Sequence, residues 1–250
     1  MKVCTLASGS SGNSLIIQTE SAKILVDAGI SLRKIINRLK KLNLDISDID
    51  AVIVTHEHAD HAVSVPNTDL PTFVSSETLN LWKDRVKNLK VFETGSSFFL
   101  NDILITPFSV PHDALDPVGF TIEEDNKKFG IVTDIGSVTA LVIERLKGSN
   151  ILVIEFNHDD KILQEGPYPW ELKQRIKSSL GHLSNSQAAK LLFRLLHDEL
   201  YHVVLAHLSE TNNRHDLAMR SAKSVLERNG VLETELSIAA RDMLGEVLSI

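Results

Sequence analysis

Cysteine is nearly absent from this chain: Cys4 is the only one among 250 residues. A single cysteine excludes an intrachain disulfide and a cysteine-based zinc finger, so a bound metal must be held by nitrogen and oxygen ligands. Long hydrophobic runs are missing as well. The apolar run at residues 151–154 is far too short to cross a bilayer, and the N-terminal segment lacks the apolar stretch of a signal peptide. We therefore expect a cytoplasmic protein with no membrane partner.

The chain also lacks internal repeats, low-complexity tracts and a Pro/Gly/Ser-rich linker. With 43% hydrophobic residues it can bury a substantial core, and we expect one domain that spans residues 1–250. Positive charge is in deficit, because the formal net charge is −7. This balance argues against a non-specific nucleic-acid binder with a basic face. Two bound divalent cations would change that argument, since they add positive charge at one point.

Short apolar runs between amphipathic segments predict an α/β protein with mixed sheets and helices on the outside. Strands are expected at residues 23–27, 51–55, 103–107, 130–133, 151–155 and 202–206. Apolar residues at helical spacing predict one helix after Ser31, a plausible N-cap, and a second from Ser184, whose spacing to Gln187 fits a capping box. A third helix is expected over residues 216–229, ending at Gly230. The last residues, 236–250, predict two short strands around a turn.

The segment THEHADH, residues 55–61, follows the apolar run AVIVT and crowds four potential metal ligands together, namely His56, His58, Asp60 and His61. Any one of these histidines alone would more often be a surface or hydrogen-bonded core residue. A strand that ends in a tight loop can turn all four side chains toward one point, whereas a long helix would spread them over different sides. Four ligands are too many for a single tetrahedral zinc with an open position, so two metals are implied if partners exist elsewhere.

Three further residues supply these partners. His112, Asp134 and His207 each follow an expected strand, and the carboxyl ends of strands are where sites gather in layered α/β folds. The expected metal ligands are therefore His56, His58, Asp60, His61, His112, Asp134 and His207. Zinc, manganese and iron(II) all accept imidazole and carboxylate, so the identity of the two divalent ions stays open.

The order of these motifs resembles that of the metallo-β-lactamase fold superfamily, in which Asp27 of VDAG precedes HEHADH and the three later ligands. The resemblance covers nearly the whole chain. It implies a four-layer αββα sandwich of two mixed β-sheets, with the metals at one edge between the sheets. It also implies two ligand sets bridged by Asp134: His56, His58 and His112 for one metal, and Asp60, His61 and His207 for the other. Asp27 would then either hold the ligand loop by hydrogen bonds or simply form a strand-end turn.

Finer motifs, LASGSSGNS, EFNHD, GPYPW, GHLSN and AHLSETNN, are similar to those of the YycJ/WalJ group, which resembles RNase Z and the phosphodiesterase branch of the superfamily. This implies a metal-dependent DNA exonuclease, with 5′-3′ polarity as the first choice. A hydroxide that bridges the metals would attack the scissile phosphate. His182 in GHLSN would protonate the leaving oxygen, with Glu155 as its orienting partner. Asp60 is counted with these two as a catalytic residue.

Contacts to the nucleic-acid substrate are less defined. Asn13 closes a small polar loop, and Ser209 and Asn213 follow His207, so these three could bind substrate or support loops and helix caps. A basic run near GHLSN could contact a phosphate backbone, and consists of Lys173, Arg175 and Lys177.

Three other interpretations share the same ligand motif. A metal pair can also hydrolyse a small ester, thioester, lactone or β-lactam. An iron enzyme can use a similar motif with one metal, and a non-catalytic module can use metals for stability alone. The sequence does not decide between DNA and RNA, fix strand polarity or give the oligomeric state.

Overall fold

The computed structural model describes residues 1–231 and 233–250, and their strands form two sheets of seven strands each. The first sheet has the order β14-β1-β2-β3-β4-β5-β6 and contains β1 (Lys2–Ala7), β2 (Ser14–Gln18), β3 (Lys23–Val26), β4 (Ala51–Ile53), β5 (Thr72–Ser75), β6 (Leu89–Phe92) and β14 (Leu248–Ser249). The second has the order β13-β12-β11-β10-β9-β8-β7 and contains β7 (Phe98–Leu100), β8 (Ile103–Ser109), β9 (Val118–Glu124), β10 (Lys127–Val132), β11 (Ile151–Glu155), β12 (His202–Ala206) and β13 (Glu235–Ile238).

Both sheets are mixed in the same way. In the first sheet, pairing is antiparallel from β14 to β3 and parallel from β3 to β6. In the second sheet, it is antiparallel from β7 to β10 and parallel from β10 to β13. Parallel neighbours end at the same edge of a sheet, so residues that follow different strands can gather there.

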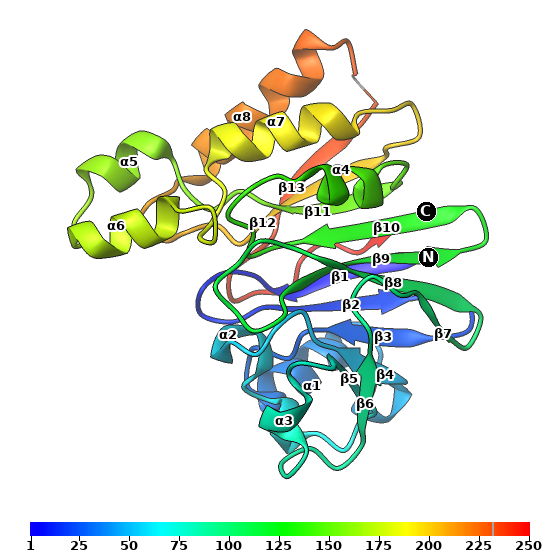
Figure 1. Cartoon of the computed structure of the whole chain (residues 1–250). Coiled ribbons are helices and arrows are strands. Elements are labelled where there is room, and N and C mark those ends of the chain that lie inside the picture. Colours follow the sequence, from blue (N-terminus) through cyan, green and yellow to red (C-terminus); the bar gives the residue numbers. More distant parts are fainter. Residues whose placement is uncertain (232) are drawn as a thin grey trace.

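The two sheets face each other, and helices cover their outer faces (Figure 1). The central core lies between the sheets, where Ile17 and Ile24 of the first sheet belong to one buried cluster with Phe120 and Phe129 of the second. The first sheet packs its other face on α1 (Leu32–Lys41), and the second on α4 (Ala140–Leu146), α7 (Asn185–Leu195) and α8 (His215–Arg228). These layers confirm the predicted αββα sandwich.

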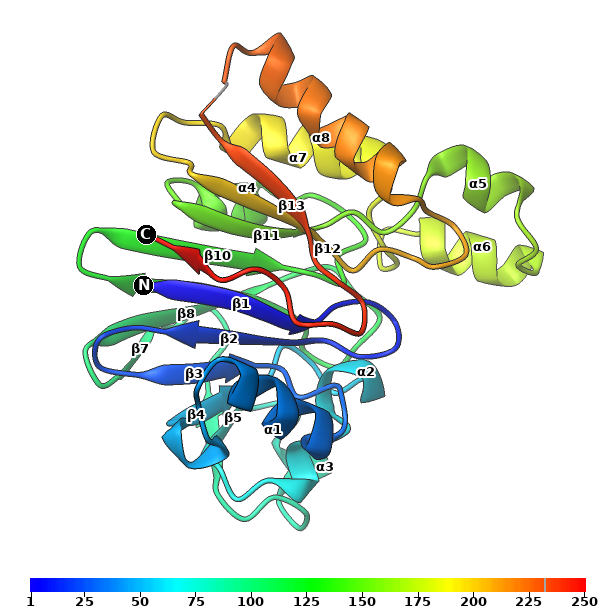
Figure 2. The ribbon, with the colours of Figure 1, turned by 180° about the vertical axis from the view of Figure 1, so that it is seen from behind.

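Shorter elements complete the structure. They are α2 (Ala59–Ala62), α3 (Leu79–Trp82), α5 (Asp160–Glu165), α6 (Trp170–Lys177) and the 3-10 turns η1 (Ile46–Asp48) and η2 (Val65–Asn67). The pair α5 and α6 projects from one end of the sandwich in both views of the ribbon (Figures 1 and 2). Within the described residues, every helix is too short or too polar to cross a membrane.

Several predicted boundaries agree with the structure. The strands predicted at residues 151–155 and 202–206 are β11 and β12, and the capping box of Ser184 and Gln187 is present at the start of α7. Ser31 does occupy the N-cap position of α1, although its side chain makes no capping hydrogen bond to a described residue. The third predicted helix, α8, lies one residue earlier at each end, and Gly230 follows it with φ +67°.

Other predictions differ in detail. The strands predicted over residues 23–27 and 51–55 end earlier, at Val26 and Ile53, and the first of them ends where Asp27 takes a positive φ of 62°. The ligand segment after β4 is not wholly a loop, since Asp60 and His61 lie in the single turn of α2. The two short strands predicted near the C-terminus are β13 and β14, which belong to different sheets rather than to one hairpin.

Candidate metal centre

Three of the strand ends that meet at one edge of the sandwich share an uncommon backbone conformation. Asp27, Asp134 and His207 follow β3, β10 and β12, and have φ values of 62°, 53° and 53°. Positive φ is rare for residues other than glycine and reverses the chain direction abruptly. The turn at each strand end brings these side chains toward the space between the two sheets.

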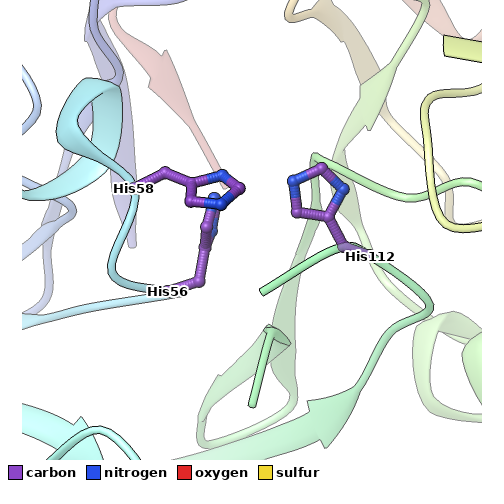
Figure 3. A group of neighbouring side chains, drawn as sticks. All are labelled: His56, His58 and His112. Atoms are coloured by element: carbon purple, nitrogen blue, oxygen red, sulfur yellow. The ribbon is translucent and has the colours of Figure 1, made fainter. Parts of the chain in front are cut away.

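The first group of potential ligands consists of His56, His58 and His112, each of which offers a ring nitrogen within 4.8 Å of the others. His56 and His58 come from the segment after β4, and His112 comes from the loop after β8; their rings converge (Figure 3). The ring centroid of His56 lies 4.6 Å from that of His58 and 5.1 Å from that of His112.

The second group consists of Asp60, His61 and His207, again within 4.8 Å of one another. Asp134 lies between the groups: its Oδ2 is 2.9 Å from His61 Nε2, and its Oδ1 is 3.9 Å from His112 Nε2. All seven residues that the sequence singled out as ligands are therefore close together, and the carboxylate of Asp134 has one oxygen near each group.

Unpartnered buried atoms test whether these residues fit a metal. Among the described residues, His56 Nε2, His112 Nε2 and His207 Nε2 are buried without a hydrogen-bond partner, and Asp134 Oδ2 makes no hydrogen bond of suitable geometry although His61 Nε2 lies 2.9 Å away. A buried polar atom without a partner is costly, and native proteins seldom keep several at one place. Divalent cations would bind all four atoms, so the residues present fit a metal centre with nitrogen and oxygen ligands.

Hydrogen bonds on the far side of the rings orient two of the histidines. Asp27 Oδ2 accepts from His61 Nδ1 at 2.7 Å, and Asp27 Oδ1 accepts from the Thr55 amide at 2.8 Å. His112 Nδ1 donates to the carbonyl oxygen of Gly181 at 3.2 Å. Such bonds fix the ring so that Nε2 is left for a metal. Asp27 thus combines both roles considered for it, since it forms a strand-end turn and holds His61.

Asn13 lies within the same centre. Its Oδ1 accepts from the Gly9 amide at 2.8 Å, which fixes the orientation of the side-chain amide. Its Nδ2 is then 2.9 Å from His61 Nε2 and 3.3 Å from the carbonyl oxygen of Asp60. The contact between Asn13 and His61 joins residues 48 positions apart, and the sequence spacing did not predict it.

Glu155 connects His207 of the second group to His182. Its Oε1 lies 2.9 Å from both His182 Nδ1 and His207 Nδ1, while Oε2 accepts the backbone amides of Ile135 and Leu183 at 3.2 and 3.0 Å. The side chain is 0% exposed. The contact between His182 and Glu155 was expected, whereas the sharing of Glu155 with His207 was not.

The charges of this network shift its pKa values. Burial would raise the pKa of Glu155, but the positive charge and the hydrogen bond of His182, together with those of His207, outweigh it and lower the pKa to about 2. Burial alone would lower the pKa of both histidines. The carboxylates reverse this effect, so the pKa of His182 is raised by Glu155, and that of His207 is raised to about 10 by Asp134, Asp60 and Glu155. Without metal, the carboxylates are thus balanced by imidazolium groups.

Gly29 and Gly181 permit close approaches between backbone segments that the sequence did not predict. A Cβ on Gly29 would lie 1.7 Å from the carbonyl oxygen of Asp60, and a Cβ on Gly181 would lie 2.2 Å from that of Arg175. No side chain fits either space. Both glycines belong to motifs described above, Gly29 to VDAG and Gly181 to GHLSN. Their presence in these motifs is the sequence feature from which the close approaches could have been predicted.

Ser209 and Asn213 belong to neither ligand group. Ser209 Oγ accepts from the Asn212 amide at 3.1 Å. The side chain of Asn213 is buried and donates to the carbonyl oxygens of Phe156 and Asn157 at 2.8 and 3.1 Å, so it supports the loop after β11. Both residues also line a cavity beside the loop that follows β12.

Comparison with known families identifies the fold. The family model described as "Beta-lactamase superfamily domain" matches residues 22–208. The chain belongs to this superfamily. Among its relatives, the exodeoxyribonuclease YycJ of Bacillus anthracis is 38% identical over 234 residues, which cover 90% of this chain and 89% of that protein. The exodeoxyribonuclease WalJ of Streptococcus pneumoniae is 38% identical over 228 residues, which cover 87% of this chain and 85% of that protein.

Solved structures show the same architecture. The metallo-β-lactamase fold protein YhfI of Bacillus subtilis aligns over 99% of this chain and 98% of its own, with a TM-score of 0.77 and 18% identity. The short form of human tRNase Z aligns over 100% of both chains, with a TM-score of 0.68 and 16% identity. At these identities the likeness concerns the fold alone.

Proposed function

We propose that this chain is a metal-dependent exodeoxyribonuclease that hydrolyses DNA from the 5′ end and uses two divalent cations. The names of its two 38% identical relatives support the reaction and the substrate. Within the structure, the observation that carries the proposal is the Glu155 carboxylate, which lies 2.9 Å from both His182 Nδ1 and His207 Nδ1. This carboxylate contacts both His182, which is outside the expected ligand set, and His207, which belongs to it. A proton donor held beside a metal centre is what phosphodiester hydrolysis needs.

The expected ligands would divide between the two cations as the superfamily resemblance implies, with Asp134 as the bridge. When bound, zinc, manganese or iron(II) would lower the pKa of a water molecule and withdraw charge from the phosphate. His61 and His112 would contribute their Nε2 lone pairs, because Asp27 and the carbonyl oxygen of Gly181 occupy Nδ1 of these two rings. Asp60 contributes a carboxylate from the more exposed side of the second ligand group.

His182 would protonate the leaving alkoxide oxygen. Its ring centroid lies 5.3 Å from those of His112 and His207, so it is adjacent to both ligand groups. The side chain is 20% exposed, which allows contact with substrate. Since Glu155 accepts from Nδ1, the proton available for transfer is the one on Nε2. Burial lowers the pKa of His182, but Glu155 outweighs this effect and raises it, which favours the doubly protonated form.

The test is digestion of single- and double-stranded DNA and RNA, labelled at either end, by protein reconstituted with each metal in turn. We expect release of short products from the 5′ end of DNA and no release by Asp134→Ala. Equal digestion by wild type and Asp134→Ala would show that the activity does not depend on this centre. Faster turnover of a thioester, lactone or β-lactam than of DNA would favour the small-molecule alternative instead.

Elemental analysis of the loaded protein tests the metal count separately. Two metal equivalents per chain are expected for wild-type protein. A single equivalent that supports full activity would favour the one-metal alternative and would overturn the bridging role of Asp134.

A further inference from the structure

A cavity of about 260 Å³ lies beside the metal centre, and none of the expected ligands lines it. Its polar lining consists of Ser8, Ser209, Glu210, Asn213, His215 and Arg241. This volume is slightly below the range of roughly 300–1,000 Å³ that is usual for drug-sized ligands. A cavity of this size can hold a small polar group and part of the molecule to which that group is attached.

The cavity shares a wall with the metal centre. Ser8 Oγ accepts from the backbone amide of His207 at 2.8 Å, so one residue contacts a metal-ligand position and lines the cavity. The neighbouring Gly9 begins the turn that Asn13 closes, and a Cβ on Gly9 would lie 3.9 Å from Arg241 Nε. The guanidinium of Arg241 therefore lies against the backbone of the loop that reaches His61 through Asn13.

The lining has the chemistry of an anion site. Arg241 provides a guanidinium, which pairs with phosphate oxygens through two parallel hydrogen bonds. Ser209 provides a hydroxyl group. His215 is the first residue of α8, a helix of 14 residues whose first turn has no side-chain cap from a described residue. The N-terminus of a helix favours an anion, and the one acidic side chain of this first turn, Asp216, is paired with Arg214 at 2.7 Å.

One feature of the lining opposes an anion. Arg241 Nη1 forms an ion pair with the Glu210 carboxylate. The Glu210 side chain is 73% exposed, whereas that of Arg241 is 32% exposed. An exposed ion pair contributes little net stability, so a phosphate dianion can replace Glu210 at the guanidinium while the Glu210 carboxylate moves into solvent.

We propose that this cavity is a subsite for the 5′-terminal phosphate of the DNA strand, with Arg241 as its main contact and Glu210 as an internal competitor. This inference rests on the proposed nuclease function and adds to it a reason for action from the 5′ end. A strand whose terminal phosphate is held here lies with its following phosphates beside His207 and the metal-ligand groups.

The experiment measures binding of a short single-stranded DNA, labelled at its 3′ end and carrying phosphorothioate linkages that resist cleavage. Fluorescence anisotropy compares a 5′-phosphate with a 5′-hydroxyl terminus on metal-loaded protein. We expect the phosphate to strengthen wild-type binding about tenfold. Arg241→Ala should bring the ratio near one, and Glu210→Gln should increase it. The control Arg220→Ala removes the same charge from a 75% exposed side chain outside the cavity, and should leave the ratio unchanged.

A wild-type ratio near one, or equal losses in Arg241→Ala and Arg220→Ala, would overturn the subsite even if DNA is cleaved. Failure of the nuclease proposal is distinguishable, since wild-type protein would then bind neither DNA. In that case inorganic phosphate replaces DNA as the probe. A rise in Tm with phosphate that is larger for wild type than for Arg241→Ala supports the subsite, and an equal rise in both overturns it.

Discussion

Replacement of His182 by alanine removes the proposed proton donor and leaves the seven expected ligands in place. The variant loses one hydrogen bond, from His182 Nδ1 to Glu155 Oε1 at 2.9 Å. Glu155 keeps His207 Nδ1 as a partner of Oε1, and Oε2 keeps two backbone amides. Because the buried carboxylate stays hydrogen-bonded, we expect a loss in the free energy of unfolding of only about 1.5–3 kcal/mol, the usual contribution of a hydrogen bond to a charged group.

The effect on catalysis depends on the leaving group. The alkoxide oxygen of DNA is strongly basic and departs slowly without a proton, so His182→Ala should lower kcat on DNA by about 10²–10⁴-fold, the usual contribution of general acid catalysis. A nitrophenolate is weakly basic and departs without protonation. On a nitrophenyl phosphodiester the same variant should therefore lose less than about tenfold.

The assay compares kcat on the two substrates for wild type and variant under the same metal loading. Metal content and Tm of the variant establish that the centre and the fold persist. Equal losses on DNA and on the nitrophenyl diester would refute the role of His182 as an acid, and would point to positioning of substrate or of His207 instead.

Three further predictions follow from the same network. First, kcat on DNA should fall as pH rises through the pKa of His182, because the protonated acid is complete below this pKa and lost above it. Burial lowers the pKa, but Glu155 raises it above its ordinary value. A pH-rate profile of His182→Ala that keeps the same fall at high pH would contradict this prediction. Second, Glu155→Gln should weaken metal binding by about 10–100-fold in a chelator competition, since His207 loses its carboxylate partner; the matched change Glu144→Gln, at a 73% exposed side chain, should have no effect. Third, Gly29→Ala should destabilise the protein by about 1–3 kcal/mol in urea denaturation, because the new Cβ would lie 1.7 Å from the Asp60 carbonyl oxygen; an unchanged midpoint would show that the ligand loop can move away.

Sequence pattern predicted the parts of the fold that local signals specify. Residues 151–154 and 203–206 are apolar runs buried on both faces, and strands formed with the predicted bounds, 151–155 and 202–206. The antiparallel strands β1 and β2 were not predicted, although the register of Val3 opposite Ile17 places them in the central core. The ligand motif could be predicted from its concentration of histidine and aspartate. The contacts that orient it could not be predicted, because Asn13 and His61, like Glu155 and His207, are far apart in the chain and only the folded sheets bring them together.

The charge of the centre explains how an acidic chain can act on a polyanion. Asp60, Asp134 and Glu155 bring three negative charges into a largely buried space, and such charges need compensation. Without metal, protonated histidines supply it, which is why the pKa of His207 is raised to about 10 while that of Asp134 is held well below its usual range by His207 and His61 despite burial. Two divalent cations carry four positive charges and would displace the protons of the ligand histidines such as His61 and His207, but not the proton of His182, which is outside the ligand set. These four charges would offset the buried carboxylates, so phosphate binding at the cations is favoured although the formal net charge of the chain is −7.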